Sequence, residues 1–515
     1  MKNEAFMLDA DVLVLGGGPA GTWAAYTAAT MGARVILADK GYCGSSGATA
    51  PAGTTLLGTF NDSIRREQEI NACLEKGDGL ADRSWIEKLH DNNDAGTAKL
   101  VELGYPFPKD QNGLPIRRSL QGPEYMRLMR KSISKIGVKI LDRSPALKLL
   151  TENEAVTGAM GVNTQTGKEW TVHAGAVIIA TGGCAFLSRA LGCNVLTGDG
   201  NLMAAEVGAE LSGMEYSNEY GMAAGFSSVT KNYLFNWAKY YRSDDSEIEN
   251  PNKRILARVM MNEPVRARLE NGADQIESEM RRTQPNFFVP FDRQGINPFK
   301  DKFPIALRLE ATVRGTGGIN LTDQSCATSV KGLFAAGDAA TRELVSGGTT
   351  GGGRINASWA IASGCLSGEG AARYALSHRK GVRTGFKLRN AHSAAKFLGH
   401  DGTKEVIRLV QNEVTPFSKN LFRTGDGLTN SLRTLDELWN HTGNGLISHE
   451  DVREVVRARE TAAMVATARM MYASALERKE SRGMHIRDDY PEQDPTMQYR
   501  LILKGVHQFS FRPQH

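Results

Sequence analysis

The chain has 515 residues, of which 41% are hydrophobic, and this length is sufficient for two or three domains. Its 62 lysines and arginines and 57 acidic residues leave a net charge of +5 without a basic tract, so the composition gives no support for nucleic-acid binding. Its six cysteines form no CxxC pair and no histidine-linked pattern, which disfavours zinc, iron–sulfur and c-type haem sites and indicates reduced thiols without a bound metal.

The N-terminus does not have the composition of a targeting segment. Residues 1–10 lack the apolar core of a signal peptide, and no run of about 18 apolar residues occurs in the chain. We therefore expect a cytoplasmic protein with no direct membrane insertion.

The first predicted element is a βαβ unit over residues 11–40. A buried strand at 12–15 ends in the glycine-rich turn 16–21, an alanine-rich helix follows at 22–31, and a second strand lies at 34–37. Strand, turn, helix and spacing together are typical of a dinucleotide-binding unit.

Each conspicuous residue of this unit has a physical reason. Gly16 permits a tight turn, Gly18 lets the backbone approach a pyrophosphate, and Gly21 lets the helix pack closely on the strand. The helix N-terminus offers free N–H groups and a positive dipole end to the anion. Asp39 follows the second strand, where a carboxylate can accept a hydrogen bond from a ribose hydroxyl. The pattern does not choose between FAD and NAD.

The elements that follow are short and alternate in type. A loop of small polar residues at 41–55 can run under a flat ring system, because small side chains let the backbone approach it. Further along we predict helices at 61–103, with a break near 77–79, and at 123–136, strands at 138–141 and 146–150, and a hairpin formed by 155–162 and 169–173.

A second glycine turn follows a buried strand at 177–179. That strand ends in Ala180, Thr181 and Gly182, a turn that can close over the cofactor or can be an ordinary strand end. Asp199 then precedes a helix at 201–207, which it can cap, and it can also face the cofactor.

Residues 214–311 differ in amino-acid composition from the flanking chain. They are richer in Asn, Arg, Tyr and Trp and poorer in glycine, which indicates an inserted domain. Its aromatic run at 232–242 can line a substrate pocket or can pack inside the insert.

The order of strand, glycine-rich loop and helix seen in the first unit recurs in the second half of the chain. A strand within 332–340 ends in Gly337 and Asp338, and a glycine loop at 346–353 leads into a helix of small residues. A helix N-terminus behind a glycine loop suits a flavin carbonyl that gathers negative charge on reduction, although a second phosphate site is the alternative.

Beyond about residue 378 the chain becomes helical. Glycine thins out, and we predict three helices at about 403–413, 428–440 and 450–478, followed by the tail 480–494.

Together these motifs resemble one family of flavoproteins. The segments that carry the resemblance are GGGPAG (16–21), IIATGG (178–183), TGDGNLMAAEVGA (197–209), GLFAAGD (332–338), NASWA (356–360) and SRGMHIRDDYP (481–491). With them the chain resembles, over most of its length, the flavoprotein subunits of succinate dehydrogenase and fumarate reductase, as a divergent soluble member related also to L-aspartate oxidase and adenylylsulfate reductase.

The resemblance implies an α/β fold and FAD as the cofactor. It implies a Rossmann-like FAD-binding domain built from two parts, 1–213 and 314–377, with an inserted α+β capping domain at 214–313 between them. A C-terminal helical domain with its tail would occupy 378–515.

The resemblance also implies a set of FAD contacts, each carried over to a position of this sequence. The pyrophosphate would lie against Gly16, Gly18, Pro19, Ala20 and Gly21, with Ala180, Thr181 and Gly182 over it, and the adenosine ribose would lie at Asp39 and Lys40. The isoalloxazine ring would lie near Ser46, Gly47, Ala48 and Thr49, and its pyrimidine edge would face Asn356, Ala357 and Ser358. The flavin and ribityl chain would lie near Asp199, Gly337 and Asp338, and Ala146 would lie elsewhere along the cofactor.

The departures from the family pattern concern the substrate. Gly47 stands where membrane-bound members have the histidine that binds FAD covalently, so we predict non-covalent FAD. The family's histidines at the entrance and exit of the capping domain are absent, and Arg354 lies only two residues before Asn356 instead of four. A dicarboxylate clamp needs its cations and donors at fixed places, so their loss argues against fumarate, succinate and aspartate.

Three residues are candidates for the catalytic chemistry. Arg314 can hold an anion or relay a proton, with a domain-interface salt bridge as the alternative. Tyr220 replaces a family histidine and can donate a proton, or can simply be packed. Arg354 can contact the substrate or can be a surface residue at a helix N-terminus. His485, in the tail, is expected to be structural, and Cys184 and Cys193 are expected to be inert.

Three functional hypotheses remain open from the sequence. The first is an FAD-dependent oxidoreductase acting on a small polar anion. The second is a catalytic subunit like that of adenylylsulfate reductase, which exchanges electrons with a separate ferredoxin-like protein. The third is a non-redox or RNA-modifying use of flavin. The sequence does not decide whether the chain forms a homo-oligomer.

Overall fold

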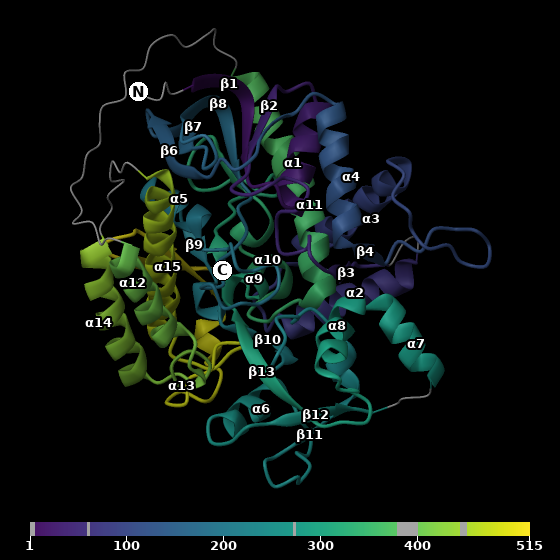
Figure 1. The fold of residues 1–515 in the computed structure, drawn as a ribbon. Coiled ribbons are helices and arrows are strands. Elements are labelled where there is room, and N and C mark those ends of the chain that lie inside the picture. The colour runs from purple at the N-terminus through teal and green to yellow at the C-terminus, as the bar shows by residue number, and fades with distance from the viewer. Residues whose placement is uncertain (1–5, 59–61, 271–273, 379–399, 443–450) are drawn as a thin grey trace.

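The computed structural model describes residues 6–58, 62–270, 274–378, 400–442 and 451–515. In Figure 1 a large sheet lies at the top, the inserted domain at the bottom and the helical domain at the left. The predicted mixed α/β class with a helical C-terminal region is confirmed. No helix of these described segments combines the length and the apolarity needed to cross a membrane.

The large sheet is mostly parallel and carries the predicted βαβ unit at its centre. Its order is β5-β2-β1-β8-β7-β6, and β15 also pairs with β8. Strands β1, β2, β5, β8 and β15 run parallel, whereas the β7–β8 and β6–β7 pairs are antiparallel. The bounds are β1 Phe6–Leu15, β2 Val35–Ala38, β5 Lys139–Leu141, β6 Ala146–Glu152, β7 Ala155–Val162, β8 Glu169–Ile179 and β15 Leu333–Ala335.

Two long helices of small residues cover this sheet next to one another. They are α1 (Pro19–Thr30) and α11 (Gly352–Ser377), which pack together over β1 and β8. Cβ atoms added at Gly364 and Gly368 would lie 2.6 Å and 2.5 Å from carbonyl oxygens of α1, so only glycine permits this approach. The other helices of this part are α2 Ser63–Lys76, α3 Arg83–Glu102, α4 Gly122–Lys135, α5 Asp199–Glu206 and the short α10 Glu343–Ser346, and the short α9 (Ala311–Arg314) lies where the inserted domain ends.

The structure refines two local predictions in this part. The strands predicted at 169–173 and 177–179 are both present but form one continuous strand, β8, because Ala174 and Ala176 between them pair with Ala10 and Val12 of β1. Asp199 does not cap α5. The N-cap is Gly198, in the left-handed region at φ 84°, so Asp199 is the first helical residue and its carboxylate is directed to Lys40.

The inserted domain is a four-stranded antiparallel sheet with helices beside it. The sheet order is β10-β13-β12-β11. Part of the aromatic run packs inside this domain, where Phe235 contacts Phe287 and Phe303. The elements are β10 Glu219–Ala224, β11 Ala238–Tyr241, α6 Lys253–Met260, β12 Arg266–Leu269, α7 Asp274–Thr283, α8 Pro285–Gln294 and β13 Phe303–Glu310.

The C-terminal part contains the three predicted helices and two strands that were not predicted. The helices are α12 His400–Val414, α14 Gly425–Thr442 and α15 Val452–Glu477, with the short α13 Phe417–Asn420. The strands β16 (Arg500–Lys504) and β17 (Ser510–Gln514) form a sheet with β9 (Leu211–Ser212) and β14 (Gly318–Ile319). The chain end therefore returns to the junction between the large sheet and the inserted domain.

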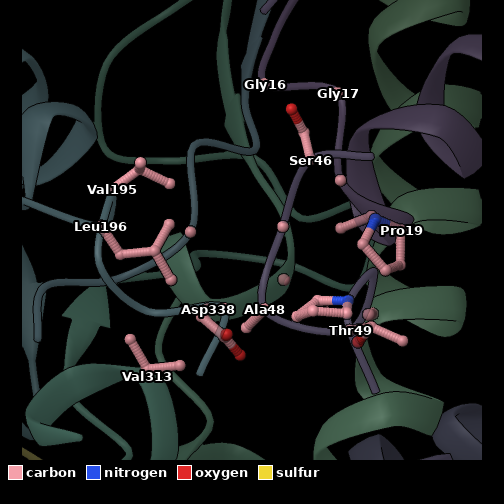
Figure 2. A pocket seen from close by; sticks show the side chains of 18 of the residues that line it. Gly16, Gly17, Pro19, Ser46, Ala48, Thr49, Val195, Leu196, Val313 and Asp338 are labelled. Atoms are coloured by element: carbon pink, nitrogen blue, oxygen red, sulfur yellow. The ribbon is translucent and has the colours of Figure 1, made fainter. Parts of the chain in front are cut away.

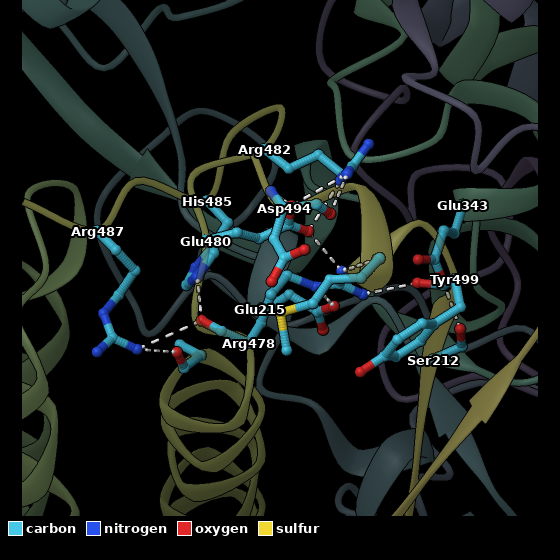
Figure 3. Close-up of polar contacts among 12 residues, drawn as sticks. Ser212, Glu215, Glu343, Arg478, Glu480, Arg482, His485, Arg487, Asp494 and Tyr499 are labelled. Atoms are coloured by element: carbon cyan, nitrogen blue, oxygen red, sulfur yellow. Dashed lines mark hydrogen bonds and ion pairs between the residues drawn. The ribbon is translucent and has the colours of Figure 1, made fainter. Parts of the chain in front are cut away.

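A group of buried charges fastens the tail at that junction (Figure 3). This junction cluster consists of Ser212, Glu215, Glu343, Arg478, Glu480 and Arg482. Arg478 pairs with Glu215 and with Glu480 at 2.8 Å each, and Glu480 also accepts from Arg482 at 2.8 Å. Removing one partner of a buried pair typically costs about 3–5 kcal/mol, because the other charge stays buried alone.

His485 has the structural role expected for it. Its ring is fully buried, with Nδ1 2.8 Å from Arg423 and Nε2 3.1 Å from the carbonyl of Arg478. Burial and the neighbouring arginines keep its pKa well below the ordinary value, so the imidazole is neutral. Nδ1 therefore accepts from Arg423 while Nε2 donates to the carbonyl.

Glu343 makes the stability of the fold depend on pH. Its burial and the adjacent charge of Glu215 raise the pKa of Glu343 to about 8, and Ser212 donates to it. Between its ordinary pKa and this value, the folded chain holds a proton that the unfolded chain releases, so stability falls as pH rises through this window.

We expect Glu343→Gln to remove this loss. As the pH rises from about 6 to about 8, the free energy of unfolding of wild type should fall relative to that of the variant by on the order of 1 kcal/mol per pH unit. Thermal unfolding at the two pH values measures it, with exposed Glu169→Gln as the control. Parallel pH profiles for wild type and Glu343→Gln would contradict the assignment.

Candidate functional site

A cavity of about 1150 Å³ opens at the carboxyl ends of β1, β2 and β8, where the inserted domain meets the large sheet. Ligands of open α/β sheets bind at this edge. Figure 2 shows Gly16, Gly17, Pro19, Ser46, Ala48, Thr49, Val195, Leu196, Val313 and Asp338 arranged around it.

The glycines of the first turn divide into two kinds. Gly16 has φ 111°, and a Cβ there would lie 2.2 Å from the carbonyl oxygen of Ala180, while a Cβ at Gly21 would lie 1.8 Å from the carbonyl oxygen of Gly16. The fold itself therefore requires both. At Gly18, by contrast, a Cβ would meet nothing nearer than Gly47 at 3.4 Å. Its missing side chain leaves room for a ligand, as a pyrophosphate at the α1 N-terminus needs.

Asp39 joins the glycine turn to the next loop. Its carboxylate accepts from the backbone N–H of Gly17 at 2.5 Å, from that of Gly41 at 2.7 Å and from the hydroxyl of Ser46 at 2.5 Å. Burial raises its pKa, whereas these donors favour the charged form. A carboxylate has about four acceptor positions, so one is left for a ribose hydroxyl.

Lys40 lies beside Asp39 in an ionic group of its own. Its Nζ is 2.8 Å from Asp199, 2.7 Å from Glu460 and 2.9 Å from the hydroxyl of Thr197. Burial opposes its charge, but Asp199 and Glu460 together raise its pKa above the ordinary value. The ammonium is thus a fixed cation at this end of the cavity.

The N-terminus of α11 forms the opposite end. Gly353 and Asn356 line the cavity there, and both amide atoms of Asn356 are buried without a partner among the described residues. A Cβ at Gly352 would meet nothing within 4 Å. An unsatisfied donor and acceptor beside a helix N-terminus match the carbonyls and N–H of a flavin pyrimidine ring.

The inserted domain closes the cavity over the loop after β2. Lys231 donates to the carbonyl of Ala48, and the side chain of Asn286 donates to that of Pro51 at 2.9 Å. Lys231 also lines the cavity. Both contacts hold the inserted domain against the segment expected under the ring system.

Arg314 is one of three charges that meet at the exit from the inserted domain. The other two, Asp338 and the buried Arg342, are paired, and Arg342 also donates to the carbonyl of Val313 at 3.1 Å. Arg314 lines the cavity and lies 3.9 Å from Glu310, beyond hydrogen-bond distance, and its Nε is buried without a partner in the described chain. Burial opposes its charge, but Glu310 and Glu219 raise its pKa, so it stays cationic.

The cavity brings together most of the residues predicted to contact the cofactor. Gly21 and Ser358 do not line it: Gly21 packs against Gly16, and the hydroxyl of Ser358 accepts from the N–H of Leu57 at 3.0 Å. The predicted residues that line it are Gly16, Gly18, Pro19, Ala20, Asp39, Lys40, Ser46, Gly47, Ala48, Thr49, Ala146, Ala180, Thr181, Gly182, Asp199, Gly337, Asp338, Asn356 and Ala357.

Of the three catalytic candidates, only Arg314 lies at the cavity. The hydroxyl of Tyr220 donates to the carbonyl of Thr415 at 2.9 Å, and its ring packs on Phe417. Arg354 points to the surface, where it pairs with Glu69 at 3.3 Å. The structure therefore packs Tyr220 against the helical domain and keeps Arg354 outside the cavity wall.

Sequence reasoning missed several residues of the cavity. Lys231 adjoins the aromatic run, and the run's Asn232 and Tyr233 do line the cavity. Val456 and Glu460 come from α15, more than 400 residues beyond the glycine turn, and carry no local signal. Burial raises the pKa of Cys184 and Cys193 to about 12, so both stay thiols, as an inert role requires.

Comparison with known proteins agrees with this geometry. Residues 11–218 match the family model for an FAD binding domain, and residues 408–507 match that for the C-terminal part of the fumarate reductase flavoprotein. The chain is 26% identical to an uncharacterized FAD-dependent oxidoreductase of Methanocaldococcus jannaschii, with 96% of each chain covered. It is 24% identical to the fumarate reductase flavoprotein subunit of Mycobacterium tuberculosis, with 94% of this chain and 92% of the other covered.

A solved structure shows the same fold. A mutant chain of E. coli quinol fumarate reductase superposes with a TM-score of 0.83 at 19% identity, covering 99% of this chain and 97% of the other. The unsatisfied amide of Asn356 and the open space at Gly18 fit FAD laid between the two helix N-termini.

The two kinds of glycine allow a direct test. We expect Gly18→Val to fold with a thermal midpoint close to that of wild type stripped of flavin, but to carry less than about a tenth of the flavin, because its side chain occupies the phosphate position. Absorbance of purified protein gives the flavin content.

Gly16→Val is the matched comparison. Its strained φ and the carbonyl contact should destabilise the fold itself by about 2 kcal/mol or more. A full complement of flavin in Gly18→Val would show that this glycine is not at the phosphate.

Proposed function

The chain belongs to the succinate dehydrogenase and fumarate reductase flavoprotein superfamily and is an FAD-dependent oxidoreductase. On this basis we propose that its substrate is a small polar anion other than fumarate or succinate, and that Arg314 holds this anion. The observation that carries the proposal is the buried and unpartnered Nε of Arg314 in the described chain, on a side chain that lines the cavity at the junction with the inserted domain.

FAD, when bound, supplies the two-electron transfer. The chain supplies the orientation of the substrate. A guanidinium that stays charged, is mostly buried and has a free N–H is suited to hold a carboxylate or another oxyanion. Because surrounding carboxylates raise the pKa of Arg314, we assign it to holding the anion and not to relaying a proton.

The charge balance near Arg314 favours an anion. The carboxylate of Asp338 is paired with Arg342, and that of Glu219 is paired with Lys253. Glu310, 3.9 Å away, is therefore the carboxylate that offsets Arg314. Lys231 adds a second positive charge on the inserted-domain side of the cavity. Anion binding by both cations would link the inserted domain, which carries Lys231, to the segment that begins at Arg314.

Two features argue for a substrate other than fumarate or succinate. Tyr220, which stands at the position of a family histidine, is directed to the helical domain. Arg354, which is near the family's substrate-binding arginine in sequence, is a surface residue paired with Glu69. A dicarboxylate clamp of the usual kind therefore lacks two of its members here.

We also propose that FAD binds without a covalent link. Gly47 stands where covalent members have their histidine, has φ 88°, and a Cβ there would lie 3.0 Å from the Cα of Gly18. A side chain is strained at this position, and the loop 41–55 contains no histidine.

A separate electron-transfer partner is the second part of the proposal. The relative from Mycobacterium tuberculosis is named as one subunit, the flavoprotein, of a fumarate reductase. The chain has no cysteine pattern for an iron–sulfur cluster, so a ferredoxin-like protein would supply one. Co-purification of the tagged chain with an iron–sulfur protein would support this, and rapid reoxidation of the reduced flavin by oxygen alone would argue against it.

The absorbance of the flavin tests both the non-covalent binding and the proposed activity. Acid precipitation of the purified protein should release yellow flavin to the supernatant, and a screen of small anions should find one that bleaches or restores the absorbance near about 450 nm without oxygen. Colour kept in the pellet would contradict non-covalent binding. A screen in which only uncharged compounds react would contradict the anion assignment.

We expect Arg314→Ala to keep its flavin and to lose about a hundredfold in kcat/KM with the anion so found, because a buried donor to the anion is removed. Steady-state rates measure this. Arg293→Ala, an exposed arginine of the inserted domain, should retain wild-type rates. Unchanged turnover in Arg314→Ala would remove this residue from the site.

A further inference from the structure

One wall of the cavity comes from the helical domain. Val456 and Glu460, one turn apart on α15, line the cavity together with Lys40 and Asp199. The family-model match to an FAD binding domain ends at residue 218, so this wall lies outside it.

The wall belongs to the end of the cavity that follows β2. Asp39 and Lys40 leave β2 at the point where Rossmann-like sheets bind the ribose next to the pyrophosphate. Ala146 and Thr164 line the same end. Val456 packs in a small apolar cluster with Leu147 and Val162 just behind it. This combination offers a flat apolar group a surface between the sheet and α15.

Ionic contacts connect α15 to the cofactor-binding loops. Glu460 reaches Lys40 at 2.7 Å, and Lys40 reaches Asp199 at 2.8 Å. The carboxylate of Asp199 accepts from Thr197 at 2.8 Å. Without Glu460, the long Lys40 side chain would keep only one carboxylate and would gain rotational freedom.

The same helix is also docked on α5. Arg459 forms a two-point pair with Glu206 and donates to the carbonyl of Leu147 at 3.0 Å. A Cβ at Gly198 would lie 2.4 Å from the hydroxyl of Thr467 on α15. Figure 1 shows α15 beside α5. Thr467 lies on the same face of α15 as Val456 and Glu460, so the face that lines the cavity also docks the helix, and Arg459 adds a further docking contact beside it.

From these contacts we propose that α15 is part of the FAD site: Val456 packs against the adenosine end of the cofactor, and Glu460 is a positioning residue that fixes the Lys40 ammonium beside the adenosine ribose. FAD binding and docking of the helical domain are then coupled. By linkage, whatever α15 adds to FAD affinity, FAD adds equally to the stability of docking. The proposal rests on non-covalent FAD, which acid precipitation tests separately, and on no assumption about the substrate.

The first experiment follows the release of FAD from the holoprotein. After dilution into flavin-free buffer, the rise of flavin fluorescence gives the dissociation rate. Glu460→Gln should release FAD about tenfold faster than wild type, because the positioning of a charge-assisted contact is lost. Glu477→Gln, the same change at an exposed position of α15, should release FAD at the wild-type rate.

A merely structural role gives a different result. If Glu460 only helped α15 to dock, Glu460→Gln would lower the thermal midpoint of the flavin-free protein but leave the release rate within about twofold of wild type, and that outcome would overturn the proposal. Faster release in Glu460→Gln with an unchanged midpoint of the flavin-free protein supports it.

Hydrogen exchange of the wild-type protein gives a second test that needs no variant. We expect peptides covering 452–461 to exchange more slowly with FAD bound than after its removal, while peptides of α14, which do not line the cavity, stay unchanged. Equal exchange of 452–461 in both states would overturn the coupling even if Glu460→Gln fails to fold.

Discussion

The structure depends on how closely two helices approach the central strands. Gly21 brings α1 onto the turn after β1, and Gly364 and Gly368 bring α11 onto α1. Side chains at these positions would overlap backbone carbonyls, so the layers would separate. Because the helices lie this close, both of their N-termini reach the carboxyl edge of the sheet. The cavity thus has one positive dipole end at the pyrophosphate position and another at the flavin ring, which suits a long anionic cofactor with an electron-accepting ring.

The rest of the chain closes this cavity from two other sides. The inserted domain contributes Lys231 at the ring end, where Arg314 follows its exit, and the helical domain contributes Val456 and Glu460 at the other end. Each therefore acts on a different part of the bound cofactor. In the function we propose, the inserted domain supplies Lys231 beside the substrate anion, and the helical domain strengthens the hold on the cofactor.

Buried charge is the cost of this arrangement. The junction cluster places Glu215, Arg478 and Glu480 in the interior, where desolvation opposes every charge and only mutual pairing offsets it. These pairs have directional geometry, so they fix the tail in one register at the junction of all three parts. Glu343 keeps its proton instead, because burial and the charge of Glu215 disfavour its ionised form, and this ties the stability of the junction to pH.

The sequence by itself determined the βαβ unit, the glycine turns, the insert and the three C-terminal helices, because each rests on local spacing and composition. Most of the residues that it predicted at the cofactor do line the cavity, since many of them sit in glycine-rich turns that leave a local signal. Tertiary structure decided the rest. Tyr220 and Arg354 stood beside Arg314 as candidates in the sequence, but only packing shows which side chain faces the cavity. The strands β16 and β17 and the wall formed by Val456 and Glu460 meet partners hundreds of residues away, and no local pattern encodes such contacts.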